Sequence, residues 1–212
     1  MVKYFDFEKS IENIDIKIAE LVSLGSIKSA NKINKLNVEK KFLYKKIYSN
    51  LNAWQKVQVA RHPERPHCIN YINTIFDNFI KLAGDKKYGE DEAILAGIGK
   101  INNKSFVIIG NEKGNTMETR IKHNFGMSKP EGYRKAQRLM HLAEKFNLPI
   151  ITFIDTAGAF PGKDAEERGQ SESIASSISK SLKVKTPIIS IIIGEGGSGG
   201  AIALATADKV LM

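Results

Sequence analysis

The sequence has a single cysteine, Cys68, among its 212 residues. One thiol cannot form an internal disulfide, and without a cysteine cluster no metal site is expected. No run of 18 or more apolar residues occurs, so we expect no transmembrane helix. The first residues also lack the apolar segment of a signal peptide. We therefore expect a protein of the reducing cytoplasm.

Charge and apolar content indicate a soluble globular protein with a sizeable core. Charged residues make up 26% and apolar residues 42% of the chain. The net charge is +9, with much of the excess in the N-terminal part, for example over residues 40–46. Such charge attracts the phosphates of nucleic acid or of a cofactor, but it equally describes a solvated helix face. Nucleic acid is therefore not the expected partner.

Three helices are predicted in the first 85 residues, over 5–24, 37–60 and 69–83. The first carries an apolar stripe at helical spacing and stops at Gly25-Ser26. That stripe consists of Ile11, Ile14, Ile18, Leu21 and Val22. The expected buried side of the second helix consists of Phe42, Ile47, Leu51, Trp54 and Val57. Two prolines within 61–66 end the second helix, and Gly84 ends the third.

Apolar strands alternate with helices after residue 85. Strands over 93–101 and 106–110 are joined by a turn at Asn102-Asn103. The further elements are a helix over 131–146, a strand over 150–154, a helix over 165–183, a strand over 188–193, a helix over about 198–206 and a strand from about 209. This alternation predicts an α/β fold, with a helical region over 1–85 and an α/β domain over 86–212. The last three residues resemble the start of a strand, so we expect a truncated form of a longer protein.

The segment 194–200 contains five glycines and lies between a predicted strand and a predicted helix. Helix N-termini have unpaired N–H groups, and glycine lets a negatively charged oxygen approach them. The spacing also matches the dinucleotide fingerprint, but no second strand with an acidic residue follows. No lysine follows the glycines, which excludes a P-loop. An anion site and simple close packing of helix on strand both remain open.

Three further segments are candidate sites. The loop 155–162 follows a buried strand and either lines a ligand site or forms a tight turn at Gly158 and Gly162. Glu166 and Glu167 lie in a predicted first helical turn, where acidic groups stabilise the helix by roughly 0.3–1 kcal/mol. Arg134, with Lys135 and Arg138 nearby, can grip a carboxylate or simply lie on the surface. The four histidines show no ligand spacing.

In this order, these segments resemble the α-subunit family of bacterial acetyl-coenzyme A carboxylase carboxyltransferases. The matching stretches are ARHPERP (60–66), NFGM (124–127), PEGYRKAQRLM (130–140), PIITFIDTAGAFPG (149–162), AEERGQSE (165–172) and IGEGGSGGAIA (193–203). The resemblance implies a crotonase-like spiral of ββα units, incomplete at the C-terminus and preceded by a helical region. It covers nearly the whole chain.

The resemblance implies transfer of a carboxyl group from carboxybiotin, presented by the biotin carboxyl carrier protein, to acetyl-coenzyme A. The product is malonyl-coenzyme A for fatty acid biosynthesis. A separate β subunit with a zinc ribbon would supply most of the coenzyme A site in an α2β2 assembly, and biotin carboxylase would be a further partner. No covalently bound cofactor is implied.

The same resemblance assigns site residues by position. Gly199 and Gly200 would donate backbone N–H groups to the biotin oxygen, and Gly158 and Ala159 would line the neighbouring wall. Gly196, Gly197 and Arg134 would complete the pocket. No protein base is needed if biotin itself accepts the acetyl proton. The family usually has Pro and Tyr at positions 157 and 160, where this chain has Ala and Phe.

Two alternatives remain beside this interpretation. One is a relative that acts on another acyl-coenzyme A, such as propionyl-coenzyme A. The other is a non-enzymatic basic binding module, for which the net charge of +9 is the motivation.

Overall fold

A computed structural model describes residues 3–23 and 27–212 of the chain. The chain divides into two compact units, Met1–Val59 and Ala60–Met212. Within the described ranges, none of the helices has both the length and the apolar character needed to span a bilayer.

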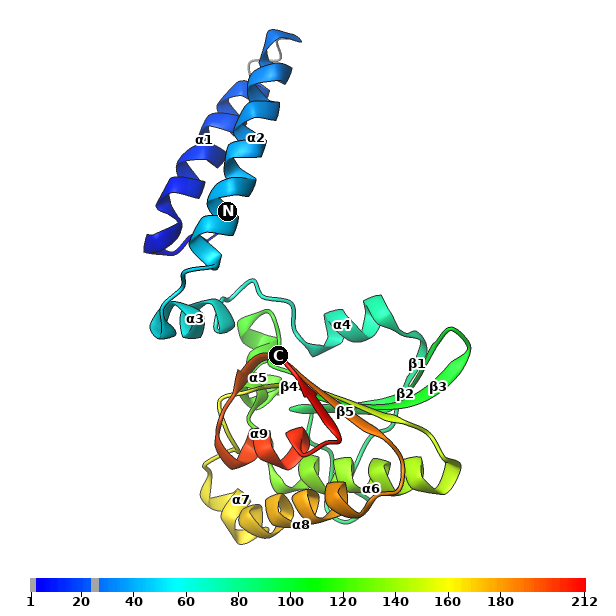
Figure 1. The fold of residues 1–212 in the computed structure, drawn as a ribbon. Helices are drawn as coiled ribbons and strands as arrows, with labels where there is room; N and C mark the ends of the chain where they lie inside the picture. The colour runs from blue at the N-terminus through cyan, green and yellow to red at the C-terminus, as the bar shows by residue number, and fades with distance from the viewer. Residues whose placement is uncertain (1–2, 24–26) are drawn as a thin grey trace. The chain divides into compact units, whose positions relative to one another are not determined.

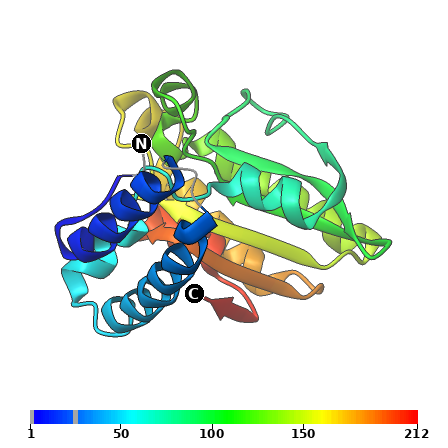
Figure 2. The same ribbon diagram turned by 90° about the horizontal axis from the view of Figure 1, so that it is seen from above.

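The first unit contains a helical hairpin. A short 3-10 helix η1 (Asp6–Glu8) leads into α1 (Lys9–Ser23), and α2 (Ile27–Tyr48) runs beside α1 (Figures 1 and 2). Ile11 and Ile14 of α1 are buried, as the predicted stripe requires, whereas Val22 is exposed. The predicted stop at Gly25-Ser26 lies outside the described residues.

The prediction of one helix over 37–60 is wrong. α2 ends at Tyr48, and α3 (Ala53–Ala60) begins after a turn. Asn52 and Gln55 exchange side-chain and backbone hydrogen bonds of 2.9 Å in both directions, a capping arrangement that starts a new helix. Three of the side chains expected on the buried face are exposed in the structure, namely Phe42, Trp54 and Val57. The apolar spacing of this lysine-rich segment therefore did not identify a core.

The second unit is built on one six-stranded sheet in the order β1-β2-β3-β4-β5-β6. The strands are β1 (Asp77–Lys81), β2 (Ile94–Ile101), β3 (Lys104–Asn111), β4 (Ile150–Thr156), β5 (Ile188–Gly196) and β6 (Lys209–Leu211). β1, β2 and β3 pair antiparallel, and β3 to β6 pair parallel. The turn between β2 and β3 has Asn102 and Asn103 at φ 50° and 63°, as the predicted hairpin requires.

Helices cover both faces of this sheet, which confirms the predicted α/β fold (Figure 1). On one face, α6 (Pro130–Phe146) and α9 (Ser198–Ala205) pack on the strands, and α8 (Gln170–Lys183) packs beside both helices. α4 (Cys68–Ile75) packs on the opposite face. The remaining helical pieces are α5 (Met117–Lys122), η2 (Asn124–Gly126) and α7 (Lys163–Glu167). Each face of the sheet thus has its own apolar cluster.

Two predicted helices differ in the structure. The helix expected over 165–183 is divided into α7 and α8, because Gly169 adopts a φ of 81° between them. The helix expected over 69–83 ends at Ile75, and residues 77–81 form β1 instead. Asn78 has a φ of 52°, which interrupts a helix, and pairing with β2 fixes the segment as an edge strand. α4 and β1 therefore pack in the second unit, although they precede the predicted domain boundary at residue 86.

Candidate functional site

The glycine turn after β5 and the loop after β4 lie against each other. β4 and β5 are parallel neighbours, so both end at the same edge of the sheet. The Gly197 N–H donates to the Thr156 carbonyl oxygen at 2.8 Å. A Cβ on Gly197 would lie 2.2 Å from the Ala157 carbonyl oxygen, so this close approach requires glycine.

Gly200 makes the closest approach to the predicted wall residues. A Cβ on Gly200 would lie 2.5 Å from the Ala159 nitrogen and 2.5 Å from the Gly158 carbonyl carbon. Gly199 is less restricted, since its Cβ would meet only Ile174 at 3.6 Å. The structure thus brings together the predicted residues of the two segments, and Gly200 is the residue that meets Gly158 and Ala159.

Some backbone N–H groups at this junction have no carbonyl acceptor within α9. Gly199 and Gly200 lie in the first turn of α9, where N–H groups have no partner four residues earlier in the helix. Ala201 is the first residue whose amide bonds back, to the Gly197 carbonyl oxygen at 3.1 Å. These amides also carry the partial positive charge of a helix N-terminus. The turn therefore presents donors suited to a negatively charged oxygen.

The loop after β4 holds the Ala159 amide between two bonded neighbours. The Gly158 N–H donates to the Thr156 hydroxyl oxygen at 3.1 Å, and the Phe160 N–H donates to the Ser128 carbonyl oxygen at 2.9 Å. The structure gives the Ala159 amide no acceptor within the described chain. The loop is thus held on both sides of a donor that adjoins Gly200.

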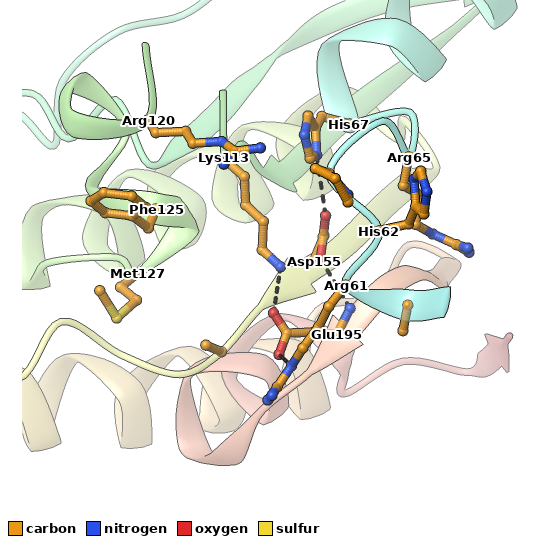
Figure 3. Close-up of a pocket in the computed structure, with 13 residues that line it drawn as sticks. Arg61, His62, Arg65, His67, Lys113, Arg120, Phe125, Met127, Asp155 and Glu195 are labelled. Atoms are coloured by element: carbon orange, nitrogen blue, oxygen red, sulfur yellow. Dashed lines mark hydrogen bonds and ion pairs between the residues drawn. The ribbon is translucent and has the colours of Figure 1, made fainter. Parts of the chain in front are cut away.

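A partly buried ion network adjoins the two segments (Figure 3). The Lys113 ammonium is 2.7 Å from the Asp155 carboxylate and 2.6 Å from the Glu195 carboxylate. The Glu195 amide donates to Asp155 at 2.9 Å, and Arg61 pairs with Glu195. Gly194 must be glycine here, because its Cβ would lie 2.3 Å from the same Asp155 oxygen. This network connects the end of β4 directly to the glycine turn.

The charges in this network stabilise one another. Asp155 is almost fully buried, and burial by itself would raise the pKa of its carboxyl. The His67 imidazole and the Lys113 ammonium outweigh burial and hold the pKa of Asp155 below its ordinary value. Burial likewise opposes ionisation of Glu195, but Lys113 and Arg61 lower the pKa of that carboxyl. Both carboxyl groups are therefore ionised at neutral pH and held in ion pairs with cations of the same chain.

Arg134 lies in a different set of contacts. Its guanidinium donates to Asp85 at 2.8 Å, to Glu131 at 3.2 Å and to the Arg168 carbonyl oxygen at 3.1 Å. Burial would raise the pKa of Asp85, but the Lys87 amide and then Arg134 lower it to about 2. Arg134 thus binds carboxylates of its own chain, and these hydrogen bonds include none to the predicted site glycines. Its place in the pocket stays a prediction.

The two neighbouring basic residues and the acidic helix turn have structural contacts. Lys135 is fully buried and donates to the Asp91 and Ile94 carbonyl oxygens, and Arg138 donates to the carbonyls of residues 82–84. Glu166 lies in the first turn of α7, as predicted. Across the described residues, no cluster of three or more metal-ligating side chains occurs.

The sequence predicted neither Lys113 nor His67 as a neighbour of the site, and it predicted no role for Glu195 within the glycine turn. Lys113 follows β3, Asp155 lies in β4, and Glu195 lies in β5. Ligand-facing residues of open α/β sheets gather at the carboxyl ends of the strands. That rule, applied to the charged residues nearest each strand end, would have grouped these side chains.

Solved structures of other proteins share the fold of this chain. Transcarboxylase 12S has a TM-score of 0.58 and 19% identity, covering 69% of this chain and 27% of that chain. The β subunit of geranyl-CoA carboxylase from P. aeruginosa has a TM-score of 0.54 and 20% identity, covering 68% and 25%. At such identities the likeness concerns the fold alone, and it confirms the expected crotonase-like α/β architecture.

The chain belongs to the family described as acetyl co-enzyme A carboxylase carboxyltransferase-like, which matches residues 4–212. It is 56% identical over 210 residues to the acetyl-coenzyme A carboxylase carboxyl transferase subunit alpha of Paramagnetospirillum magneticum, covering 98% of this chain and 66% of that one. The corresponding subunit of Rhodospirillum centenum is 54% identical, with coverages of 99% and 67%. The chain thus spans about two thirds of the length of these relatives. The family resemblance seen in the sequence is confirmed.

Proposed function

We propose that this chain supplies the biotin-facing part of an acetyl-coenzyme A carboxylase carboxyltransferase site. The observation that carries the proposal is the contact of Gly200 with the Gly158-Ala159 backbone, which gathers amide donors from two loops. The reaction is carboxyl transfer to acetyl-coenzyme A, giving malonyl-coenzyme A. The family membership supports the reaction, and the geometry supports the residues.

The donor set fits the group that it would hold. When bound, carboxybiotin supplies the carboxyl group, and negative charge develops on its ureido oxygen as that group leaves. The amides of Gly199 and Gly200 would stabilise this charge, each by on the order of 3 kcal/mol. Glycine at position 200 lets α9 lie directly against the loop after β4, because a Cβ there would clash with the Ala159 nitrogen and the Gly158 carbonyl carbon. Gly197 lets the turn lie close to the loop after β4, and Gly196, whose Cβ would meet only Ile192, is proposed to line the pocket.

Partners follow from the subunit role. We propose a β subunit that completes the coenzyme A side of the site, the biotin carboxyl carrier protein as the source of carboxybiotin, and biotin carboxylase as the enzyme that charges it. Two α and two β subunits would assemble in the cytoplasm. A helical region over 1–85 and a carboxyltransferase domain over 86–212 remain the proposed domain organisation, with α4 and β1 contributing to the fold of the second.

Gly200→Val tests this function directly. We expect kcat for malonyl-coenzyme A formation, measured with the β subunit and the charged carrier, to fall at least 10²-fold (about 2.7 kcal/mol). Gly89→Ala is the control, because no atom lies within 4 Å of the added Cβ. Retained activity in a Gly200→Val complex that assembles normally would contradict the assigned role.

A further inference from the structure

A cavity of about 300 Å³ lies at the carboxyl edge of the sheet, beside the glycine turn (Figure 3). Its floor contains Lys113, Asp155 and Glu195, which follow or end three successive strands. Arg65 and Arg120 enter it from the loop before α4 and from α5. This volume is at the lower end of the range for small-molecule sites.

The carboxylates on the floor are already neutralised by this chain. Lys113 contacts both Asp155 and Glu195, and Arg61 pairs with Glu195. Because both acids are already paired, they do not neutralise the positive charge of the other cations that line the cavity.

Arg65 and Arg120 are the surplus cations of the cavity. Each uses its Nε to bond a backbone carbonyl, that of Ile193 for Arg65 and that of Gly114 for Arg120. Neither guanidinium forms an ion pair with a carboxylate in the part of the chain that the structure describes. Guanidinium groups held through Nε keep their terminal N–H groups in a fixed plane, the geometry that binds oxyanions.

His67 provides a second, independent sign of a ligand. Its residue is only 4% exposed, and its side chain lines the same cavity. Its Nδ1 contacts an Asp155 oxygen at 3.5 Å, but its Nε2 has no hydrogen-bond partner among the described residues. Buried polar groups are almost always hydrogen-bonded, so this imidazole lacks an expected partner.

We propose that this cavity binds a small phosphate-bearing anion between Arg65, Arg120 and His67. Two guanidiniums from different segments match a tetrahedral group with several oxygens better than a carboxylate with two. Phe125 and Met127 form an apolar wall that would receive the organic part of the ligand. The proposed glycine donors do not line this cavity, so the anion site goes beyond the proposed carboxyl transfer. The cavity adjoins the two site segments, because Ala157 of one segment and Glu195 of the other line it.

Calorimetric titration of inorganic pyrophosphate into the complex that contains this chain tests the proposal. We expect saturable binding, weakened at least tenfold by Arg65→Gln and by Arg120→Gln. Arg138→Gln is the matched control, because its guanidinium holds the carbonyls of residues 82–84 and does not line the cavity. A titration with malonate should show weaker binding than pyrophosphate. Circular dichroism verifies that each variant is folded.

Three results would overturn the proposal. They are no saturable binding to the unmodified complex, unchanged affinity in both cavity variants, or an equal loss in Arg138→Gln, which would indicate general attraction to a basic chain. If a variant fails to fold, Arg120→Lys replaces it, since lysine keeps the charge but loses the planar fork. Competition by coenzyme A would identify the phosphate as that of the substrate, whereas binding unaffected by coenzyme A indicates a free phosphate compound. Because binding is measured without turnover, failure here leaves the carboxyl-transfer proposal untouched.

Discussion

The helical hairpin unit and the sheet unit bury apolar and charged groups to different extents. In the described part of the hairpin unit, the buried apolar side chains are Ile11 and Ile14, and the buried Glu8 carboxylate accepts a hydrogen bond from the Tyr48 hydroxyl. The sheet unit has an apolar cluster on each face and also buries charged groups such as Asp155 and Lys135. A buried charge destabilises the folded protein unless it is paired. We therefore expect the loss of one partner of an ion pair to lower the free energy of unfolding more in the sheet unit than in the hairpin.

Among the substitutions considered for the two units, replacement of Lys113 should lower the free energy of unfolding the most. Lys113→Met leaves Asp155 and Glu195 without their shared cation, and we expect a loss of about 3–5 kcal/mol in the free energy of unfolding. Chemical denaturation followed by circular dichroism measures it. Lys113→Arg, which keeps the charge, should recover most of the loss. A decrease below 1 kcal/mol would show that solvent already compensates the two acids.

The stability of the hairpin should depend more on low pH than on removal of the Lys40–Asp15 ion pair by mutation at neutral pH. Burial would raise the pKa of Asp15, but bonds from Lys40 and the Tyr4 hydroxyl lower it overall. A lowered pKa means that Asp15 stabilises the folded hairpin above its unfolded pKa of about 3.9, and that this contribution disappears as the pH falls through the folded value.

We expect protection of the α1 amides in hydrogen exchange to decrease below about pH 4. Lys40→Met should cost only about 0.5–1 kcal/mol at neutral pH, because both partners are partly solvated. Protection that is constant from pH 6 to pH 3 would contradict this account.

Trp54 should be the least sensitive position. Its side chain is 64% exposed, although helical spacing suggested a buried one. Trp54→Ala should change the free energy of unfolding by less than about 0.5 kcal/mol. Circular dichroism is the suitable probe, since Trp54 is the only tryptophan and its fluorescence is lost. A change above 2 kcal/mol would indicate that this surface is covered in the assembled protein.

The sequence was most informative where local chemistry determines structure. The two asparagines at 102 and 103 predicted the hairpin, and Pro130 marks the beginning of α6. It was least informative for β1, whose residues form a strand only because β2 offers an edge to pair with. The register of Asp77–Lys81 is a tertiary effect that the spacing of apolar residues does not contain.

The candidate site shows the same division. Glycine spacing after a strand indicated an anion-binding turn, and the family resemblance named Gly199 and Gly200. Neither could show that Gly200 lies against Ala159, because that contact depends on how two separate loops are packed. The Lys113 network was missed for the same reason, since its members are far apart in the chain.

The bond between the Glu195 amide and Asp155 spans 40 positions of the chain. α7 and α8 lie between the two residues, so the crossover must be complete before β5 can add to β4. Closing such a segment costs conformational entropy before any contact compensates for it. During synthesis, the loop after β4 therefore emerges well before the glycine turn and has to wait for it. We therefore expect the site to form later than local elements of the sheet unit such as the β2–β3 hairpin.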